Sequence, residues 1–242
     1  MSAAEQLQLR PGQSTELLKE LHILTREGKL NQDSRRKLKQ VYHLHQFIDQ
    51  LLRELPQGDE GPSIVDHGAG KSYLGFIVYD LSLQSSGRGR VYGIETRQDL
   101  VERSRSLAQR FGFERMQFLH SSAADAAENA ALPERVDLVT ALHACDTATD
   151  DAIAFGLRKQ ANATGFGLRK QPPGMVLVPC CQAEVAAHLR QHKALSLSRT
   201  PLAELWRHPL HTREVGSQLT NVLRSLYLEA CGYSVTVTEL VG

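Results

Sequence analysis

The sequence predicts an α/β fold in which an N-terminal helical extension precedes a doubly wound, mainly parallel sheet. Two observations predict this fold class. Short apolar runs alternate with segments of helical periodicity between residues 63 and 179, which implies right-handed crossovers between parallel strands. Conspicuous polar residues also follow the apolar runs directly. Because ligands of parallel sheets bind at the carboxyl ends of the strands, the second pattern predicts a binding site at one edge of the sheet.

The chain is expected to divide into three regions. These are a disordered tail over residues 1–13, a helical extension over residues 14–60 and an α/β domain over residues 61–242. Apolar spacing in the extension favours helices over residues 14–27 and 33–55. The second helix is expected to be N-capped by Asn31, Asp33 or Ser34.

Composition favours a cytoplasmic protein. The four cysteines have no regular spacing, which argues for a reducing compartment rather than a disulfide framework. The N-terminus is polar, without the apolar core of a signal peptide. No apolar run approaches the roughly 20 residues that a membrane span requires, so we expect no membrane association. The net charge of +1 indicates no global attraction to nucleic acid.

The stretch from Ser63 to Gly70 predicts a strand, a tight turn and the start of a helix. A short apolar run ends in the acid Asp66, and the chain then passes through Gly68 and Gly70. Glycines leave the backbone open, so a ligand can lie against the main chain where the next helix begins. The alternative is an ordinary β–α turn that binds nothing.

Two familiar nucleotide sites fit this corner poorly. A phosphate-binding loop requires glycine at the position of Val65. A dinucleotide fold requires its third glycine two positions before Gly75, and Asp66 would repel a pyrophosphate. A sulfonium with an amino-acid tail carries positive charge, which suits an acid at the end of a strand. The corner therefore predicts S-adenosylmethionine as the ligand.

The next two strands extend this predicted site. The run from Arg90 to Glu95 ends in an acid, 29 residues after Asp66. A carboxylate at this place accepts both ribose hydroxyls of a bound nucleoside. After the third strand, the small residues Ser122 and Ala123 are expected beside the adenine.

The remaining elements follow in order. A helix is expected over residues 98–110, strands over 116–120, 136–142, 173–179 and 233–239, and a helix over 215–230. The sheets of proteins that use the predicted ligand to transfer methyl groups normally close with one more antiparallel strand. No residues remain for that strand, so we expect either a sheet one strand short or a truncated chain. The sequence Phe-Gly-Leu-Arg-Lys-Gln occurs at 155–160 and again at 166–171, and we interpret the second copy as a local duplication.

Basic residues are concentrated in the second predicted helix, at residues 34–40. They are Arg35, Arg36, Lys37 and Lys39. One interpretation is a basic flap that binds a polyanion such as RNA. The other is a solvated face of an amphipathic helix, which is what charge runs usually are.

These motifs together resemble the class I S-adenosylmethionine-dependent methyltransferases. The motifs are Asp66-His-Gly-Ala-Gly70, Gly93-Ile-Glu95, His143-Ala-Cys-Asp146 followed by Thr149-Asp150, and Pro179-Cys-Cys181. Within that superfamily, the chain is similar to the methyltransferase-domain family that includes glutathione S-transferase C-terminal domain-containing proteins. The resemblance covers about residues 35–242. It implies a seven-stranded Rossmann-like sheet, methyl transfer, and a methyltransferase domain over residues 61–242.

The resemblance and the motifs together define an expected site. Cofactor binding is assigned to Asp66, Gly68, Ala69, Gly70, Glu95, Ser122, Ala123 and His143. Catalysis is assigned to His143, Cys145, Asp146, Cys180 and Cys181. The resemblance places the ends of the fourth and fifth strands side by side, which would bring the catalytic group together.

Three chemistries remain open for that catalytic group. His143 or Asp146 could accept a proton in a pocket that these residues line. A cysteine could instead attack a pyrimidine ring and activate its carbon. A zinc site is the third alternative, although adjacent cysteines rarely chelate one metal well, and we predict no metal. Buried cysteines without chemistry are also common.

We expect a cytoplasmic methyltransferase that acts on RNA, either ribosomal or transfer RNA, and binds it through residues 34–40. A protein or a small molecule is the alternative acceptor. A further alternative is a binding module that keeps the fold and the cofactor without catalysis. The sequence makes no prediction of the oligomeric state.

Overall fold

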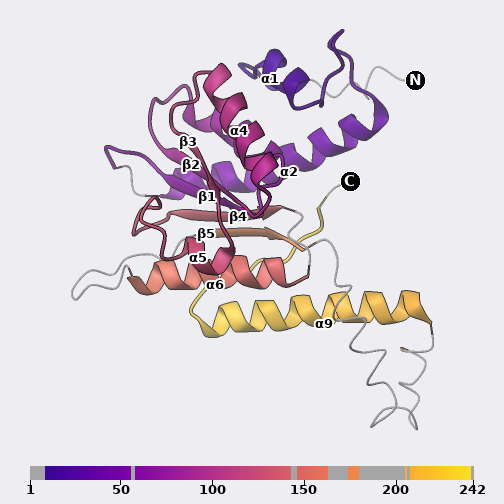
Figure 1. Ribbon diagram of the computed structural model, residues 1–242. Coiled ribbons are helices and arrows are strands. Elements are labelled where there is room, and N and C mark those ends of the chain that lie inside the picture. Colours follow the sequence, from indigo (N-terminus) through magenta and orange to yellow (C-terminus); the bar gives the residue numbers. More distant parts are fainter. Residues whose placement is uncertain are drawn as a thin grey trace.

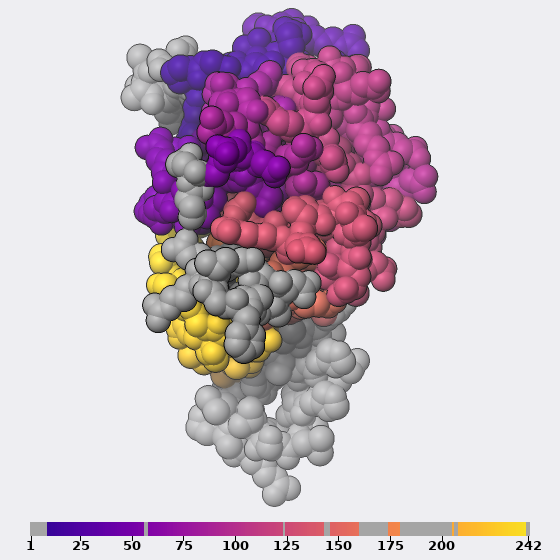
Figure 2. All heavy atoms as spheres, turned by 90° about the vertical axis from the view of Figure 1, so that its left-hand side faces the viewer, coloured from indigo at the N-terminus to yellow at the C-terminus, as the bar shows by residue number. Residues whose placement is uncertain are grey.

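The computed structural model describes most of the chain as one layered α/β body. The described residues are 9–55, 58–142, 146–162, 174–179, 205 and 208–240. Helices cover both faces of a central sheet, with α2 and α4 on one side and α5 and α6 on the other (Figure 1). In Figure 2 the indigo N-terminal residues lie at the top of the view and the yellow residues of α9 lie in its lower half.

The sheet confirms the predicted doubly wound, parallel fold. Its strands are β1 (Ser63–His67), β2 (Arg90–Glu95), β3 (Met116–His120), β4 (Leu138–Leu142) and β5 (Gly174–Val178). All neighbouring strands are parallel, in the order β3-β2-β1-β4-β5. The chain winds outward from β1 in both directions, so β1 and β4 flank the topological switch point, where ligands of such sheets bind.

The helices agree with the predicted elements in most places. They are α1 (Thr15–Glu20), α2 (Gln32–Glu54), α3 (Tyr73–Val78), the π-helical turn η2 (Tyr79–Leu83), α4 (Gln98–Arg110), α5 (Ala123–Ala126), α6 (Thr147–Asn162) and α9 (Pro209–Ala230). The side chain of Asn31 caps α2 by accepting a hydrogen bond from the Ser34 N–H, which confirms the first of the three predicted caps. The first copy of the repeated hexapeptide lies within α6, and the second copy lies outside the described residues.

The first predicted helix is shorter than expected. It was predicted over residues 14–27, but α1 ends at Glu20. His22 then adopts a left-handed conformation with φ of 55°, which α-helical hydrogen bonding cannot continue through. The tight turn lets Leu21, Ile23 and Leu24 all reach the core, although their spacing also fits a helix.

The helical extension shares the core of the sheet. Leu17 and Leu18 of α1 and Leu38 of α2 belong to the same buried cluster as Ile64 of β1 and Leu138 of β4. A second cluster fills the other face of the sheet, beneath α5 and α6. The extension therefore stabilises the sheet directly by burying apolar surface against it.

Part of the predicted tail also contacts this body. Arg10 donates a hydrogen bond to the carbonyl of Tyr42 over 3.0 Å and another to the His45 ring. Gln13 accepts a hydrogen bond from the Tyr42 hydroxyl. Burial and the nearby Arg10 lower the pKa of His45 to about 4, so this histidine is neutral and acts as a structural polar group. Residues 1–8 lie outside the described residues.

The prediction of a strand over residues 233–239 is wrong for this structure. These residues are described, but they form no regular structure, and Val237 is 77% exposed. A β-branched composition favours extended backbone, but a strand also needs a partner for its hydrogen bonds. Within the described part of the chain, the sheet has five strands rather than the seven that the resemblance implied.

Helix α9 begins at Pro209, earlier than the predicted start at residue 215, because proline is well tolerated in the first turn. Its apolar residues Leu219, Val222, Leu223, Leu226 and Tyr227 are exposed, whereas Thr212, Gly216, Arg224 and Leu228 are buried. No described helix is long and apolar enough to cross a membrane.

We predict that Gly93→Ala destabilises the fold. A Cβ at this position of β2 would lie 2.6 Å from Cδ1 of Phe118 and 3.4 Å from the Cβ of Ala69. Overpacking of this kind costs about 1–3 kcal/mol, which denaturant unfolding would measure. Gly58→Ala is the matched control, because a Cβ there meets nothing within 4 Å. Equal free energies of unfolding for the two variants would contradict this account of Gly93.

Candidate functional site

The corner between β1 and α3 is a compact turn of backbone groups. Gly68, Gly70 and Ser72 all have positive φ, of 63°, 57° and 52°. The Ala69 N–H donates to the carbonyl of Ile94 on β2 over 2.9 Å, which holds the turn against the neighbouring strand. The glycines leave main-chain atoms uncovered at this place, as a closely bound ligand requires.

Asp66 lies beneath this turn and ties it to β4. Its carboxyl group accepts hydrogen bonds from the hydroxyls of Thr140 over 2.9 Å and Ser72 over 3.4 Å. Burial raises the pKa of Asp66 to about 6, against the lowering effect of these hydrogen bonds. The side chain is only 2% exposed, so the structure gives Asp66 a positioning role, and its contact with a cofactor stays a prediction.

Glu95 closes the corner from the end of β2. Its Oε2 accepts a hydrogen bond from the Gly70 N–H over 2.7 Å, and its Oε1 accepts one from the Arg97 N–H over 3.0 Å. Burial raises the pKa of Glu95, but the hydrogen bonds from Arg97 and Gly70 outweigh burial and leave it below the usual range. The site therefore holds an ionised carboxylate beside the glycine turn.

The end of β3 also reaches this corner. The Ser121 N–H donates to the carbonyl of Glu95 over 3.2 Å, so the predicted adenine-side residues follow directly beside Glu95. The hydroxyl of Ser122 caps α5, accepting from the Asp125 N–H and donating to the Asp125 carboxylate. Ala123 begins α5. Contact of Ser122 and Ala123 with a ligand stays a prediction.

The predicted catalytic group is described only at Asp146. His143, Cys145, Cys180 and Cys181 lie outside the described residues. Leu142 pairs with Val178, so β4 and β5 end side by side, as the resemblance implied. The part of the chain that is described holds no cluster of three or more possible metal ligands, but those cysteines and His143 fall beyond it.

Asp146 stands at the start of α6 with a left-handed φ of 47°. Its carbonyl accepts a hydrogen bond from Nη2 of Arg224 over 2.9 Å. Arg224 also forms a bidentate ion pair with Asp150, with distances of 2.7 and 2.6 Å. Helix α9 therefore fixes the first turn of α6, next to the end of β4.

The structure adds two residues that sequence reasoning missed. His67 is buried at the end of β1, 6.0 Å from Phe155 between ring centroids, and neither ring nitrogen has a hydrogen-bond partner among the residues that the structure describes. Burial lowers its pKa, so the ring is neutral. Arg97 reaches back to Glu95, with Nε 3.1 Å from Oε1. Their only signal in the sequence is their position within or just after the two motifs that carry Asp66 and Glu95.

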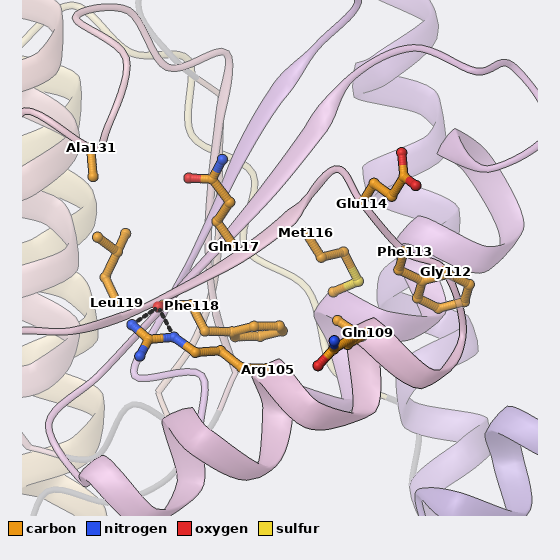
Figure 3. A pocket seen from close by; sticks show the side chains of 11 residues that line it. Arg105, Gln109, Gly112, Phe113, Glu114, Met116, Gln117, Phe118, Leu119 and Ala131 are labelled. Carbon is orange, nitrogen blue, oxygen red and sulfur yellow. Dashed lines mark hydrogen bonds between the residues drawn. The ribbon is translucent and has the colours of Figure 1, made fainter.

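A cavity of about 590 Å³ lies elsewhere, between α4 and the outer edge of β3. Figure 3 shows Arg105 among its lining residues, with its guanidinium directed to the carbonyl of Phe118. This interaction covers a carbonyl at the edge of the sheet, where unpaired strands are prone to association. None of the predicted site residues lines this cavity.

A comparison with models of protein families gives a match over most of the described α/β body. The model of a family described as a methyltransferase domain matches residues 36–188. A search of curated proteins gave no match.

Three solved structures illustrate the similarity. An rRNA methylase from Streptococcus thermophilus is 14% identical, covers 49% of this chain and 63% of its own, and gives a TM-score of 0.37. Magnesium protoporphyrin IX methyltransferase from Synechocystis PCC 6803 is 18% identical, with coverages of 62% and 64% and a TM-score of 0.39. Precorrin-6y C5,15-methyltransferase from Geobacter metallireducens is 18% identical, with coverages of 53% and 59% and a TM-score of 0.37. The chain spans less than two thirds of the length of each.

We predict that Asp66→Asn changes how stability depends on pH. The pKa of Asp66 rises from 3.8 to about 6 on folding, so the folded protein keeps a proton that the unfolded chain releases. Stability therefore falls as pH rises between these two values. A pKa shift of one unit corresponds to about 1.4 kcal/mol. The free energy of unfolding of Asp66→Asn should therefore exceed that of the wild type by up to about 3 kcal/mol at pH 7 and equal it below pH 4.

Denaturant unfolding between pH 3.5 and pH 8 would measure this difference. Asp59→Asn, on an exposed turn, is the control for the change of net charge. Parallel stability curves for the wild type and Asp66→Asn would show that burial does not hold a proton on Asp66.

Proposed function

The chain belongs to the methyltransferase-domain family, and we propose that it transfers the methyl group of S-adenosylmethionine to RNA. The observation that carries the methyl-transfer part is the corner in which the Gly70 N–H meets the Glu95 carboxylate over 2.7 Å. It unites the glycine turn with the acid of the next strand at the carboxyl edge of a parallel sheet, where ligands of this fold class bind.

The residues at this corner fit a nucleoside cofactor. Glu95 is ionised and ends β2, so it can accept hydrogen bonds from two ribose hydroxyls. A Cβ built on Gly68 would meet nothing within 4 Å, so space exists above this part of the turn. S-adenosylmethionine supplies an electrophilic methyl group on its sulfonium when bound. The chain's own residues bind and orient it, because methyl transfer requires the acceptor and the methyl group to be close and aligned.

The position of the basic helix supports RNA as the acceptor. Helix α2 packs against α3, whose first residue, Tyr73, directly follows the corner. Lys37 of α2 pairs with Asp33 over 2.8 Å. The charged side chains of Arg36, Lys39 and Lys71 are exposed. The basic start of α2 therefore borders the carboxyl edge of the sheet, where a polyanion next to the cofactor would need positive charge.

We predict that labelled methyl groups from S-adenosylmethionine appear in the RNA of a cell extract. The extract is incubated with the full chain and with Glu95→Ala, then divided and treated with nuclease or protease. Nuclease-sensitive label that falls at least about tenfold with Glu95→Ala is expected, because a buried polar site that loses its partner discriminates strongly.

Label that survives nuclease but not protease would favour a protein acceptor. Label in small molecules would favour the other alternative acceptor. Binding of the cofactor without label in any fraction would indicate a non-catalytic module. Each of these results would overturn RNA as the acceptor.

We predict a second, separate effect of the double variant Arg36→Ala/Lys39→Ala. RNA affinity should fall several-fold, and the slope of log affinity against log salt should decrease by about 1–2, because each lost phosphate contact removes about one released counterion. The control is Arg53→Ala/Arg88→Ala. It removes the same charge at the opposite edge of the sheet, where α2 ends and β2 begins. Equal losses for both double variants would contradict a specific role for the start of α2.

A further inference from the structure

The guanidinium of Arg97 lies in the corner that the proposed function assigns to the cofactor. Its Nε is 3.1 Å from Oε1 of Glu95, and its Nη2 is 3.4 Å from Oε2. The same Nη2 lies 3.7 Å from the place where a Cβ on Gly70 would stand. Arg97 therefore covers both carboxylate oxygens from the side on which the glycine turn is open.

The donors around Glu95 differ in how firmly they are held. The N–H groups of Gly70 and Arg97 belong to the backbone and are fixed by the turn and by the start of α4. The guanidinium stands at the end of a long side chain that is 64% exposed. The guanidinium can therefore leave Glu95 without moving the backbone, as can the exposed hydroxyl of Thr96, which donates to Oε1 over 3.3 Å.

The local field at the guanidinium acts in two directions: Glu95 and Asp99 raise the pKa of Arg97 and so favour its charge, whereas the start of α4 acts against it. Arg97 is the N-cap residue of α4, a helix of 13 residues, and its side chain makes no capping hydrogen bond. The N-terminus of a helix carries partial positive charge, which disfavours a cation there. Within the described part of the chain, the Arg97 side chain donates its hydrogen bonds to Glu95, at distances of 3.1 and 3.4 Å. The Glu95 side chain is only 8% exposed, but the Arg97 end of the ion pair lies in solvent, and screening at that end limits the stability that the pair contributes.

We propose that Arg97 is a displaceable occupant of the ribose position and thereby sets the affinity for the cofactor. The proposal rests on the proposed function, because it takes Glu95 as the acceptor of the ribose hydroxyls. Two guanidinium N–H donors leave the carboxylate and two hydroxyl donors replace them, so Glu95 keeps its hydrogen bonds throughout. The binding free energy gained at Glu95 is the difference between its hydrogen bonds to the ribose and its hydrogen bonds to Arg97. This difference is smaller than the gain would be if the carboxylate had no donor to lose.

The test compares cofactor binding in three full-length proteins. Isothermal titration calorimetry with S-adenosylhomocysteine, which cannot donate a methyl group, measures affinity without turnover. Arg97→Gln is expected to bind about two- to fivefold more tightly than the wild type at low salt, since an ion pair with a solvent-exposed partner contributes about that factor. Arg90→Gln removes the same charge at the other end of β2, where Arg90 is exposed, and should bind like the wild type.

Salt and a second substitution make the test specific. Raising the salt from roughly 50 mM to 500 mM screens the ion pair, so the wild type should approach Arg97→Gln. In a Glu95→Gln background, the gain from Arg97→Gln should disappear, because the two substitutions act on one interaction. Because Arg97 is exposed, thermal unfolding of each variant should remain cooperative and close to that of the wild type.

Two results separate this proposal from the proposed function. If the wild type binds S-adenosylhomocysteine but Arg97→Gln binds equally or more weakly, Arg97 does not compete with the ligand and only the present inference is overturned. If neither the wild type nor Arg97→Gln binds the ligand while both are folded, the cofactor assignment itself fails, and this inference fails with it.

Discussion

The rest of the site depends on the hydrogen bonds that the buried carboxyl group of Asp66 accepts. It joins the hydroxyl of Thr140 on β4 to the hydroxyl of Ser72 at the start of α3. These three residues come from the two central strands and from the turn between strand and helix. A polar group buried at such a junction must keep its hydrogen bonds, so it fixes the position of the glycine turn. Glu95 can then meet Gly70 because the turn is already held from beneath.

Much of the fold was predictable because its signals are local. The periodicity of residues 98–110 predicts a helix that the structure has at the same residues, and the apolar run that ends in Asp66 predicts a strand where the structure has β1. The N-cap at Asn31 was predictable for the same reason. Predictions failed where a distant partner decides the outcome. Residues 233–239 have the composition of a strand but pair with no strand among the described residues, and residues 21–27 bend away because three apolar side chains must all reach the core.

The candidate site was predictable at its backbone but not at its side-chain contacts. The spacing of Gly68, Gly70 and Glu95 predicted a corner, and the structure brings these residues together. Nothing in the sequence distinguishes an acid that faces a ligand from one that is enclosed like Asp66. The return of Arg97 onto Glu95 depends on where α4 begins relative to β2. Arg224 contacts the start of α6 from 74 residues away along the chain, a pairing that only the folded topology creates.

The packing of the N-terminal segment shows that the region matched by the family is smaller than the region that shares one core. The region recognisable by family begins at residue 36, within α2, after the cap at Asn31 and after all of α1. The region that folds is larger, because Leu17 and Leu18 are completely enclosed against the same core as Leu38. A chain that began at residue 36 would keep the residues of the site but would lose α1, whose leucines bury part of the core. Sequence similarity thus marks the part that the family shares, whereas burial shows that residues before this part belong to the same core.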